Sequence, residues 1–489
     1  PVDSIAMFID YRIKRISFLN FFIIHHLNEK IFKNTKISKN KMKIVLVHPP
    51  HMFRGTKDKQ IKIRTPSWFP LGLGYIAKAL LNDKHSIEIF EINAHQYTKE
   101  EMMNKIKELK YDAIGISALC TQYKYVKWLS SKLKEHNKNP IILGGPLATY
   151  SYDVVLKNSE IDICVIGEGE LTIRDLVKNL NNLEKVKGIA FKKKNKIKKT
   201  EPREYIKELD AIDFPAWDLF PMHIYFKYSK VSKDYKTKTA TIIASRGCPY
   251  NCNYCSREYR GMRCRSNDNV IAEIKELISK YNIKGINILD NLFFSSRSRA
   301  LEFCKKIKPL KIKWTCDGRA NLIYEDVLKA AKKAGCLSIG YGIESGSQTI
   351  LNNMNKEVTV EQNIKAVRAT LKAGINPATP MMYGYPGETK GTIKETLDFF
   401  KKADFFSKGF SITTALPGST LYDDCIKKEL IKDEDEYLEK LERGIAGGEK
   451  FIINFTDFTE DEFYKYKEEM ERTIQINYLK RHPLGAMEI

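Results

Sequence analysis

The sequence predicts an α/β protein with two successive sets of βα repeats, a doubly wound parallel sheet followed by a partial barrel. Apolar segments of strand length alternate with amphipathic helical segments from Met42 to about residue 180, and again from Thr241 to about residue 420. The chain has 489 residues, 43% of them hydrophobic, which is enough for two or three domains with a core each. A charged, helical region follows the second set of repeats.

Five apolar segments in the first set have the length and composition of strands. They cover residues 43–47, 86–91, 112–117, 140–144 and 162–166. Because helical segments separate them, we expect a doubly wound parallel sheet in a domain over residues 42–180. Thr98 and Glu101 have the spacing of a capping box, which predicts that a helix begins at Thr98.

The ends of these predicted strands carry small residues and one glutamate. Ligands of an open parallel sheet bind beyond the carboxyl ends of its strands, and glycine lets a backbone come close to a flat ligand. Tight βα turns also need glycine, so the pattern alone leaves a ligand site and plain turn chemistry equally open. The residues concerned are Ser117, Gly144, Gly145, Gly167, Glu168 and Gly169.

Residues 181–235 are predicted to form a hairpin and a linker. Lysines alternate over residues 192–199 with Asn195 at the turn, which predicts an exposed hairpin that protects a sheet edge. Residues 209–221 contain Trp217, several prolines and several aspartates, and this composition predicts a stiff connector with a packed tryptophan.

Residues 1–41 are predicted to be an N-terminal appendage. A disordered segment, a short interfacial helix over residues 16–24 and an extension upstream of a start at Met42 all fit the sequence. The apolar stretch is too short to cross a bilayer, so we expect no transmembrane segment.

The second set contains six further βα repeats. The predicted strands are residues 241–244, 286–289, 312–316, 337–342, 379–384 and 410–414, with helices such as 270–281 and 360–371 between them. Six repeats predict a partial (β/α)6 barrel over residues 236–420, with its active site on the loops at the strand carboxyl ends. In the helical C-terminal region, residues 421–489, we expect helices at 434–443 and 460–480 that cover the open barrel.

Three cysteines follow the first barrel strand with the spacing Cys-x3-Cys-x2-Cys: Cys248, Cys252 and Cys255. Three soft thiolates on one short loop suit a [4Fe-4S] cluster with one iron left open. A structural zinc site needs a fourth ligand, usually from a second pair, and Cys264 is the nearest candidate. Since the other cysteines are spread singly, we predict one iron–sulfur cluster only.

This loop, with Tyr254 before its last cysteine, resembles the signature of the radical S-adenosylmethionine superfamily. The resemblance implies that the open iron binds S-adenosylmethionine and that the cluster splits it into methionine and a 5′-deoxyadenosyl radical. It also implies that Tyr254 flanks the adenine, that Asp290 and Asn291 line the methionine end, and that Glu344 lies near the ribose or amino group. From the residues alone, Glu344 could instead cap the next helix.

Asp317 and Arg319 follow the third predicted barrel strand. An internal ion pair between them and a contact with a ligand are equally open.

The order of the strand-end loops in residues 42–180, with Pro70 opening the first helix, resembles the cobalamin-binding domain that precedes the radical core in one large subfamily. The resemblance implies that these loops bind cobalamin. The Asp-x-His-x-x-Gly motif of cobalamin mutases is absent, and Leu147 stands where relatives often carry histidine. We therefore expect no histidine ligand, and predict that His48, His51 and His95 are packing or surface residues.

The two resemblances together imply a cobalamin-dependent methyltransferase that acts on an unactivated carbon, or phosphorus, of a small or lipid-like molecule. An external one-electron donor of the flavodoxin or ferredoxin type is implied as its partner. The alternative is a radical cyclase or rearrangement enzyme without methyl transfer. A transfer RNA methylthiotransferase is not favoured, because its additional cluster cysteines and its RNA-binding module are absent from the sequence.

Net charge and cysteine content limit which partners and which cellular compartment we expect. The chain has 82 lysines and arginines against 60 aspartates and glutamates, a net charge of +22, which favours polyanions. The lysines are scattered over predicted helix faces, so we expect a solvated basic surface and no nucleic-acid partner. Ten cysteines without regular pairing and no predicted signal peptide indicate a reducing cytoplasm.

Overall fold

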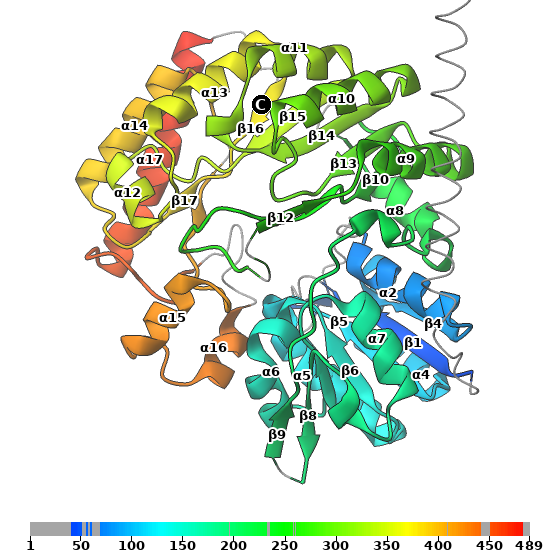
Figure 1. The fold of residues 1–489 in the computed structure, drawn as a ribbon. Helices are drawn as coiled ribbons and strands as arrows, with labels where there is room; N and C mark the ends of the chain where they lie inside the picture. The colour runs from blue at the N-terminus through cyan, green and yellow to red at the C-terminus, as the bar shows by residue number, and fades with distance from the viewer. Residues whose placement is uncertain are drawn as a thin grey trace, which may run out of the picture.

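The computed structural model describes residues 41–50, 55–56, 59–60, 69–194, 196–231, 235–257, 259, 261–407, 409–441 and 450–482. Residues 43–199 form the lower domain in Figure 1, the strands from β10 to β18 with their helices form the upper domain, and α15 and α16 lie at the lower left beside α6. The predictions for the appendage up to residue 40, for His51 and for the turn at Asn195 lie outside the described residues.

The first domain is built on a seven-stranded sheet in the order β4-β1-β5-β6-β7-β8-β9. The first five strands in this order are parallel, which confirms the predicted doubly wound parallel sheet. After β1 the chain forms β4 on one side of it and then crosses over to form β5 on the other side, so the strand order reverses at β1. The bounds are β1 Lys43–His48, β4 Ser86–Glu91, β5 Ala113–Ser117, β6 Ile141–Gly144, β7 Ile163–Val165, β8 Ile189–Lys193 and β9 Lys196–Lys199. The short strands β2 Gly55–Thr56 and β3 Lys59–Gln60 form a separate pair.

The predicted lysine-rich hairpin is the pair β8–β9. It does not belong to the connecting segment alone, because β8 pairs antiparallel with β7 and so continues the first sheet. All four residues of β9 are exposed at the sheet edge, where their lysines oppose pairing with another chain.

Two helices of the first domain, those that follow Pro70 and Thr98, begin where the sequence predicts them. The capping box at Thr98 is confirmed: its hydroxyl accepts the N–H of Glu101 at 3.1 Å, and the Glu101 carboxylate accepts the N–H of Thr98 at 2.8 Å. The helices are α2 Leu71–Asn82, α3 Ile92–His95, α4 Lys99–Glu108, α5 Tyr123–His136, α6 Pro146–Asn158 and α7 Gly169–Lys178, with η1 Cys120–Gln122 and η2 Leu183–Lys185 as single turns.

The connector between the domains is packed, as predicted. Trp217 is buried and stacks on Phe69 with ring centroids 4.2 Å apart. Pro215 lies so close to α2 that a Cβ added to Gly74 would be 2.9 Å from the proline Cβ. The connector contains η3 Leu209–Ala211, η4 Trp217–Leu219 and α8 Met222–Tyr228.

The second domain contains the six predicted repeats, but its fifth strand is divided. The main sheet has the order β10-β13-β14-β15-β16, while β17 and β18 form a separate parallel pair. The prediction of one strand over residues 379–384 was wrong: residues 376–378 and 382–383 are separate strands, and the chain opposite the gap turns at Glu344, whose φ is +62°. A bridge between Glu344 and Met381 joins the two parts of the barrel. The bounds are β10 Thr239–Ile242, β13 Gly285–Ile288, β14 Lys313–Gly318, β15 Cys336–Tyr341, β16 Asn376–Ala378, β17 Met382–Tyr383 and β18 Ser411–Ile412.

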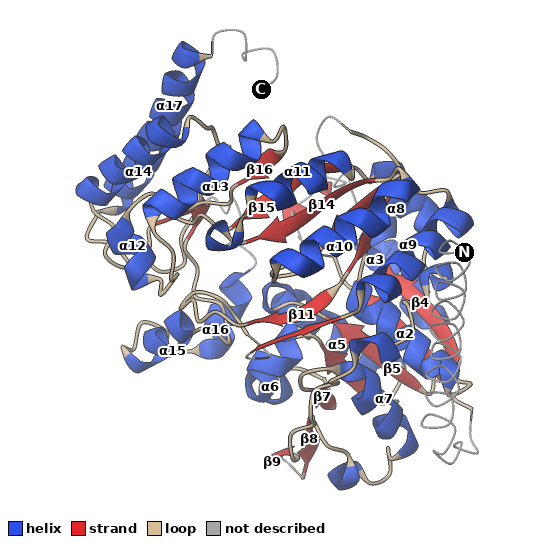
Figure 2. Cartoon of the chain, turned by 45° about the horizontal axis from the view of Figure 1, so that its top comes forward, coloured by secondary structure: helices blue, strands red, loops and turns tan. Residues whose placement is uncertain are grey.

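Helices pack along these strands, as Figure 2 shows for α10, α11 and α13. The bounds are α9 Asn267–Tyr281, α10 Arg297–Ile307, α11 Glu325–Lys333, α12 Gln348–Asn353, α13 Val360–Lys372 and α14 Lys390–Ala403, with η5 Lys308–Leu310 and η6 Ala320–Leu322 as single turns.

An antiparallel ribbon that we did not predict interrupts the first barrel repeat. Its strands are β11 Ser245–Cys248 and β12 Gly261–Cys264, and they pair in register. Two of the three predicted cluster cysteines lie in the loop between these strands, and the third ends β11. We call these two strands the cluster ribbon.

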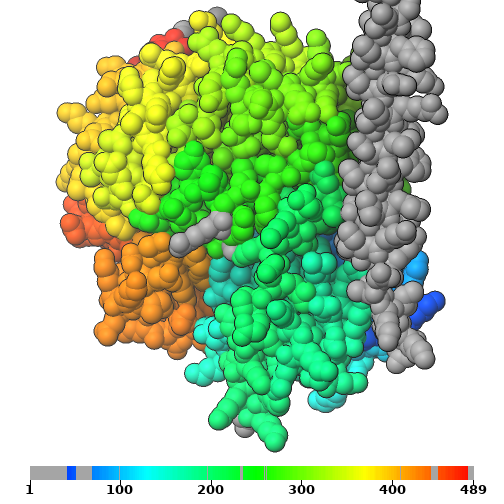
Figure 3. All heavy atoms as spheres, in the orientation of Figure 1, coloured from blue at the N-terminus to red at the C-terminus, as the bar shows by residue number. Residues whose placement is uncertain are grey.

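The C-terminal region divides between the two domains. Helix α17 lies along α14, and Tyr383 donates its hydroxyl to the carbonyl of Phe463 at 2.9 Å, so α17 covers the barrel beside β17. The orange segment with α15 and α16 packs below the barrel and beside the first domain (Figure 3). The bounds are α15 Thr420–Lys427, α16 Glu434–Lys440 and α17 Glu460–Arg481. Among the described residues, every helix is too short or too polar to cross a membrane.

Candidate active site

The carboxyl ends of the strands in the two domains face each other. Glu168, directly beyond β7 of the first domain, binds Arg246 on β11 and Arg263 on β12 of the second domain, each at 2.9 Å. On the other side, Gly418 beyond β18 lies against Tyr150 of α6, so closely that an added Cβ would be 2.3 Å from the tyrosine ring. Glu168, a predicted site residue of the first domain, therefore contacts the strands that flank the cysteine loop of the second domain.

The cysteine loop is held in place by its backbone. The N–H of Asn253 donates to the carbonyl of Met354 at 2.9 Å, and its carbonyl accepts the N–H of Leu421 at 2.8 Å. Ser256 donates its hydroxyl to the carbonyl of Pro417 at 2.7 Å. These bonds thus fix the loop between the end of α12 and the start of α15.

The three thiols of this loop differ in exposure. Cys252 is buried, Cys248 is half-buried and Cys255 is exposed. Burial of the sulfur of Cys255, followed by the charges of Cys252 and Cys248, raises the pKa of Cys255 above its ordinary value. Cys264, the candidate fourth ligand for zinc, ends β12 and is exposed.

Donor geometry alone does not define a metal site in the described part of the chain. No group of three or more histidine, cysteine, aspartate or glutamate side chains converges there as metal ligands. The donor set of the loop, three thiols and no carboxylate or imidazole, fits iron in a cluster by its chemistry. The spacing of the cysteines carries the interpretation.

A buried polar triad lies beside the loop. Tyr254 donates its hydroxyl to Oε1 of Glu344 at 2.9 Å, and Nζ of Lys356 is 3.0 Å from the same oxygen and 2.7 Å from the tyrosine hydroxyl. Burial, followed by the charge of Glu344, raises the pKa of Tyr254 far above its ordinary value, which keeps the phenol protonated. Sequence reasoning found Tyr254 and Glu344 but missed Lys356, which follows no strand end.

Glu344 does not cap a helix, which was the alternative role. The next helix, α12, has Ser347 as its N-cap and no side-chain capping bond. Glu344 itself has a φ of +62°, in the left-handed region that is costly for a residue with a Cβ. Backbone strain of this kind is concentrated at functional sites, which favours a ligand role.

Asp290 is buried at the start of the cluster ribbon. Its carboxylate accepts the N–H of Ala244 and the hydroxyl of Ser245, both at 2.7 Å. Burial raises the pKa of Asp290 to about 6. The side chain therefore anchors the start of β11, while Asn291 beside it is exposed.

Arg319 and Asp317 are not joined by an ion pair in the described structure. The Arg319 guanidinium lies over the ring of Tyr250 at 3.4 Å and 4.0 Å from the sulfur of Cys252. Burial, with a smaller contribution from Asp290, raises the pKa of Asp317 to about 6.

The glycines at the strand ends of the first domain divide into two kinds. A Cβ on Gly144 would meet nothing within 4 Å, and one on Gly167 would meet only Tyr205 at 4.0 Å, so both have open space above them. A flat ligand can approach the backbone there, which fits cobalamin. Gly169 instead packs α7 against α2, since an added Cβ would be 2.7 Å from Ile76.

Gly145 is required by its turn. It has a φ of +83°, and an added Cβ would be 2.8 Å from the carbonyl oxygen of Ala118. Its neighbour Gly144 pairs in register with Ser117, so three of the predicted residues are brought together.

Two of the three histidines that we predicted to be packing or surface residues are described: His48 is buried and His95 is exposed. His48 is buried, with Nδ1 2.8 Å from Oε1 of Glu91. His95 stacks on Tyr97 with ring centroids 5.1 Å apart, and burial lowers its pKa.

A cavity of about 590 Å³ lies away from this interface. It is lined by α8, α9 and neighbouring lysines and contains none of the predicted site residues. The candidate site therefore rests on the facing strand ends and the cysteine loop.

Comparisons with known proteins agree with this architecture. The family model described as the radical SAM superfamily matches residues 242–400, and the B12 binding domain model matches residues 64–177. An uncharacterised methyltransferase of Pyrococcus horikoshii is 34% identical over 401 residues, 80% of this chain and 84% of that protein. The anaerobic magnesium-protoporphyrin IX monomethyl ester cyclase of Cereibacter sphaeroides is 29% identical, over 73% of this chain and 59% of the cyclase.

Solved structures share the fold. The radical S-adenosylmethionine methyltransferase TsrM from Kitasatospora setae, solved with cobalamin and a [4Fe-4S] cluster, superposes with a TM-score of 0.64 at 16% identity, covering 80% of this chain and 75% of TsrM. With the family models and the Pyrococcus relative, the facing domains lead to one conclusion. The chain belongs to the radical S-adenosylmethionine superfamily, in the group that carries a B12-binding domain before the radical SAM domain.

Proposed function

We propose that the protein is a cobalamin-dependent radical methyltransferase that acts on an unactivated carbon, or phosphorus, of a small or lipid-like molecule. One observation carries the proposal: the cysteine loop of the barrel faces the strand-end loops of the B12-binding domain across a shared interface. Methyl transfer needs reactive centres held in line, and this arrangement supplies that proximity. The Pyrococcus relative, named a methyltransferase, supports it.

The thiolates of Cys248, Cys252 and Cys255 are the proposed ligands of the cluster. A [4Fe-4S] cluster held by these thiolates would supply the electron for the reductive cleavage of S-adenosylmethionine. The protein keeps this loop fixed through the backbone bonds of Asn253 to α12 and α15.

The buried triad is the proposed contact for S-adenosylmethionine. Tyr254 presents its ring beside the loop, and Glu344 presents a carboxylate that is already oriented by Lys356 and by a strained backbone. A carboxylate held in a dry site binds an ammonium or a hydroxyl group strongly. Asp290 keeps its role at the start of β11, and Asn291 is the exposed neighbour that can reach the methionine end.

Gly144, Gly145 and Gly167, with Ser117 beside them, are the proposed seat of cobalamin. Open space above Gly144 and Gly167 lets the corrin approach the backbone. His48 and His95 are engaged in packing, which supports cobalamin binding without a histidine ligand from these residues.

The remaining partners follow from the chemistry. Cleavage of S-adenosylmethionine needs an electron, so we expect a one-electron donor of the flavodoxin or ferredoxin type. The ten cysteines are free, which fits a reducing cytoplasm. Scattered lysines do not favour a nucleic-acid substrate.

A radical cyclase without net methyl transfer is the second candidate. The likeness to the Cereibacter cyclase, at 29% identity, favours it specifically. Product mass after anaerobic turnover with S-adenosylmethionine labelled in its methyl group separates the two candidates, since only the methyltransferase leaves the label in the product.

The proposal is tested on anaerobically purified, reconstituted protein. We expect iron–sulfur absorbance together with a corrinoid band. Cys252→Ala should lose the iron and all cleavage of S-adenosylmethionine, whereas Cys264→Ala, at an exposed cysteine outside the loop, should keep both. Stoichiometric zinc in place of iron would contradict the proposal, and a cluster without corrinoid would favour the cyclase.

A further inference from the structure

Four charged residues connect the two domains, and we call them the domain latch: Glu168, Glu170, Arg246 and Arg263. Oε1 of Glu168 is 2.9 Å from Nη1 of Arg246, and its Oε2 is 2.9 Å from Nη1 of Arg263. Glu170 binds the other nitrogen of Arg246 at 2.5 Å. One carboxylate of the first domain thus holds both strands of the cluster ribbon.

The latch is largely withdrawn from solvent. The side chains of Arg263 and Glu168 are 9% and 10% exposed, and that of Arg246 is 18% exposed. Burial alone raises the pKa of Glu168, but the bonds and charges of Arg263 and Arg246 outweigh it and hold the pKa below its ordinary value. The carboxylate is therefore charged and accepts three hydrogen bonds, because the N–H of Ile206 also donates to it at 2.8 Å.

Pairing of the ribbon explains why one carboxylate is shared. Arg246 and Arg263 are directly opposite each other in the antiparallel register. Two like charges at such a position repel and destabilise the pair unless an anion lies between them. Glu168 supplies this anion from the other domain.

Aromatic rings fix the orientation of the two guanidinium groups. Arg263 lies over Tyr259 at 4.3 Å and over Tyr205 at 5.1 Å, while Arg246 lies over Tyr75 of α2 at 5.4 Å. Stacking on a planar ring restricts a guanidinium more than an ion pair alone does. The arginines of the domain latch are consequently held in one orientation, unlike those of an exposed surface ion pair.

We propose that Glu168 is a positioning residue that sets the placement of the cysteine loop relative to the cobalamin loops. The proposal rests on the function proposed above. Arg246 precedes Cys248 by two positions on β11, roughly 7 Å along an extended strand. Glu168 lies between Gly167 and Gly169, at the predicted cobalamin seat, so a change at one residue reaches both centres. Oε1 of Glu168 accepts one hydrogen bond and Oε2 accepts two, so the contact of Glu168 with a cofactor stays a prediction beside this positioning role.

The first experiment needs no cofactor. Hydrogen exchange in the full chain is measured for peptides that cover the cluster ribbon in Glu168→Gln, which removes the charge at constant shape, and in Glu168→Asp, which keeps the charge and shortens the side chain. We expect at least tenfold faster exchange of β11 and β12 in both variants. Glu184→Gln is the control, because Glu184 also binds two cations, Lys193 and Lys198, but within one domain at the surface. Unchanged exchange in folded Glu168 variants overturns the proposal.

The second experiment reads the placement directly. In reconstituted protein, the magnetic interaction between the reduced cluster and the Co(II) form of bound cobalamin depends on their separation. We expect Glu168→Asp to retain full iron and corrinoid content but to show a changed interaction. An interaction identical to that of the unaltered protein overturns the latch. Absence of corrinoid from the unaltered protein contradicts the proposed function instead, and leaves the exchange experiment to decide on the latch.

Discussion

Buried carboxyl groups in this protein differ in charge because their partners differ. Glu168 lies beside two guanidinium groups, which lower its pKa. Glu388, in the loop after β17, accepts the N–H of Gly384 at 2.9 Å and the hydroxyl of Thr392 at 3.1 Å. Burial outweighs these bonds and raises the pKa of Glu388 to about 7. Because of these partners, Glu168 is ionised at neutral pH, whereas Glu388 is only partly ionised.

Replacement of Glu388 should change how stability depends on pH. A carboxyl whose pKa is higher in the folded state contributes least above that pKa, so its contribution falls as the pH rises from about 4.5 to about 7. Glu388→Gln removes the group that ionises, so the variant does not lose this part of its unfolding free energy as the pH rises. We expect the variant to match the unaltered chain near pH 4.5 and to exceed its free energy of unfolding by about 3 kcal/mol at pH 8.

Denaturant unfolding of both chains across this pH range checks the prediction about Glu388. An energy difference that stays constant from pH 4.5 to pH 8 would contradict it.

Lys356 compensates a buried charge at the candidate site. Its side chain is 8% exposed, and it is the cation that pairs with Glu344 in the described structure. Lys356→Met leaves the Glu344 carboxylate buried with Tyr254 as its one side-chain donor among the described residues, which should lower the free energy of unfolding by about 3–5 kcal/mol. Lys440→Met, which removes an exposed pair with Glu436, should cost less than about 1 kcal/mol. Denaturant midpoints of the cofactor-free chains compare the two, and equal small losses would argue against the buried triad.

At the scale of single elements, a glycine decides how β6 leads into α6. Gly145→Ala forces a Cβ into the left-handed region and against the carbonyl of Ala118, so we expect a loss of about 1–3 kcal/mol in unfolding free energy. Gly72→Ala is the matched control, because Gly72 is exposed within α2 and an added Cβ would meet nothing within 4 Å. There alanine should stabilise the helix by about 0.5–1 kcal/mol.

Thermal unfolding of the cofactor-free chains shows whether each of the two glycine substitutions lowers or raises the stability. A stabilising effect at Gly145 would show that its turn tolerates a side chain. The same measurement also separates the structural role of Gly145 from its proposed role under cobalamin, since no ligand is present.

For the whole molecule, each apolar core combines residues of the first domain with residues from later parts of the chain. One core combines the α2 and α7 side of the first sheet with the barrel, through the connector around Trp217. The other combines α4, α5 and α6 with α15 and α16 from the C-terminal region. Later parts of the chain therefore pack against both faces of the first domain. We expect the two domains to keep a fixed arrangement for this reason.

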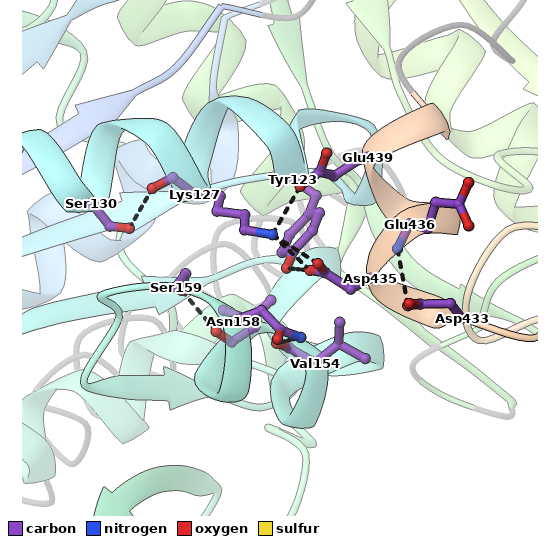
Figure 4. Close-up of polar contacts among 11 residues, drawn as sticks. Tyr123, Lys127, Ser130, Val154, Asn158, Ser159, Asp433, Asp435, Glu436 and Glu439 are labelled. Atoms are coloured by element: carbon purple, nitrogen blue, oxygen red, sulfur yellow. Dashed lines mark hydrogen bonds and ion pairs between the residues drawn. The ribbon is translucent and has the colours of Figure 1, made fainter.

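Helix α16 is attached to the first domain by a polar contact as well (Figure 4). Lys127 of α5 lies 2.8 Å from Asp435 and 2.8 Å from Glu439, and the buried Tyr123 donates its hydroxyl to Asp435. Asp435→Ala leaves this hydroxyl without its acceptor, a cost of about 1–3 kcal/mol. We expect roughly fivefold or faster hydrogen exchange in residues 434–440.

Glu436→Ala is the control for α16, since Glu436 is on the same helix but pairs only with Lys440 in the described structure. Equal exchange in the two variants would mean that the apolar core alone holds α16 on the first domain.

The sequence determined the features that are encoded within short stretches of chain. The parallel strands of the first sheet, the capping box at Thr98 and the helices α9, α13 and α17 were predictable, because hydrophobic periodicity and end signals are local. The cysteine loop was predictable for the same reason: its spacing lies within eight residues, Cys248 to Cys255.

Only the tertiary structure decided which residues of different elements contact each other. Glu168 meets Arg246 and Arg263 across 78 and 95 positions, and Tyr254 meets Lys356 across 102. The placement of β8 beside β7 and the division of the fifth barrel strand likewise depend on neighbours in space. Such contacts form because folding brings buried charges to the partners that compensate them, and no periodicity or local spacing in the chain records which partners those are.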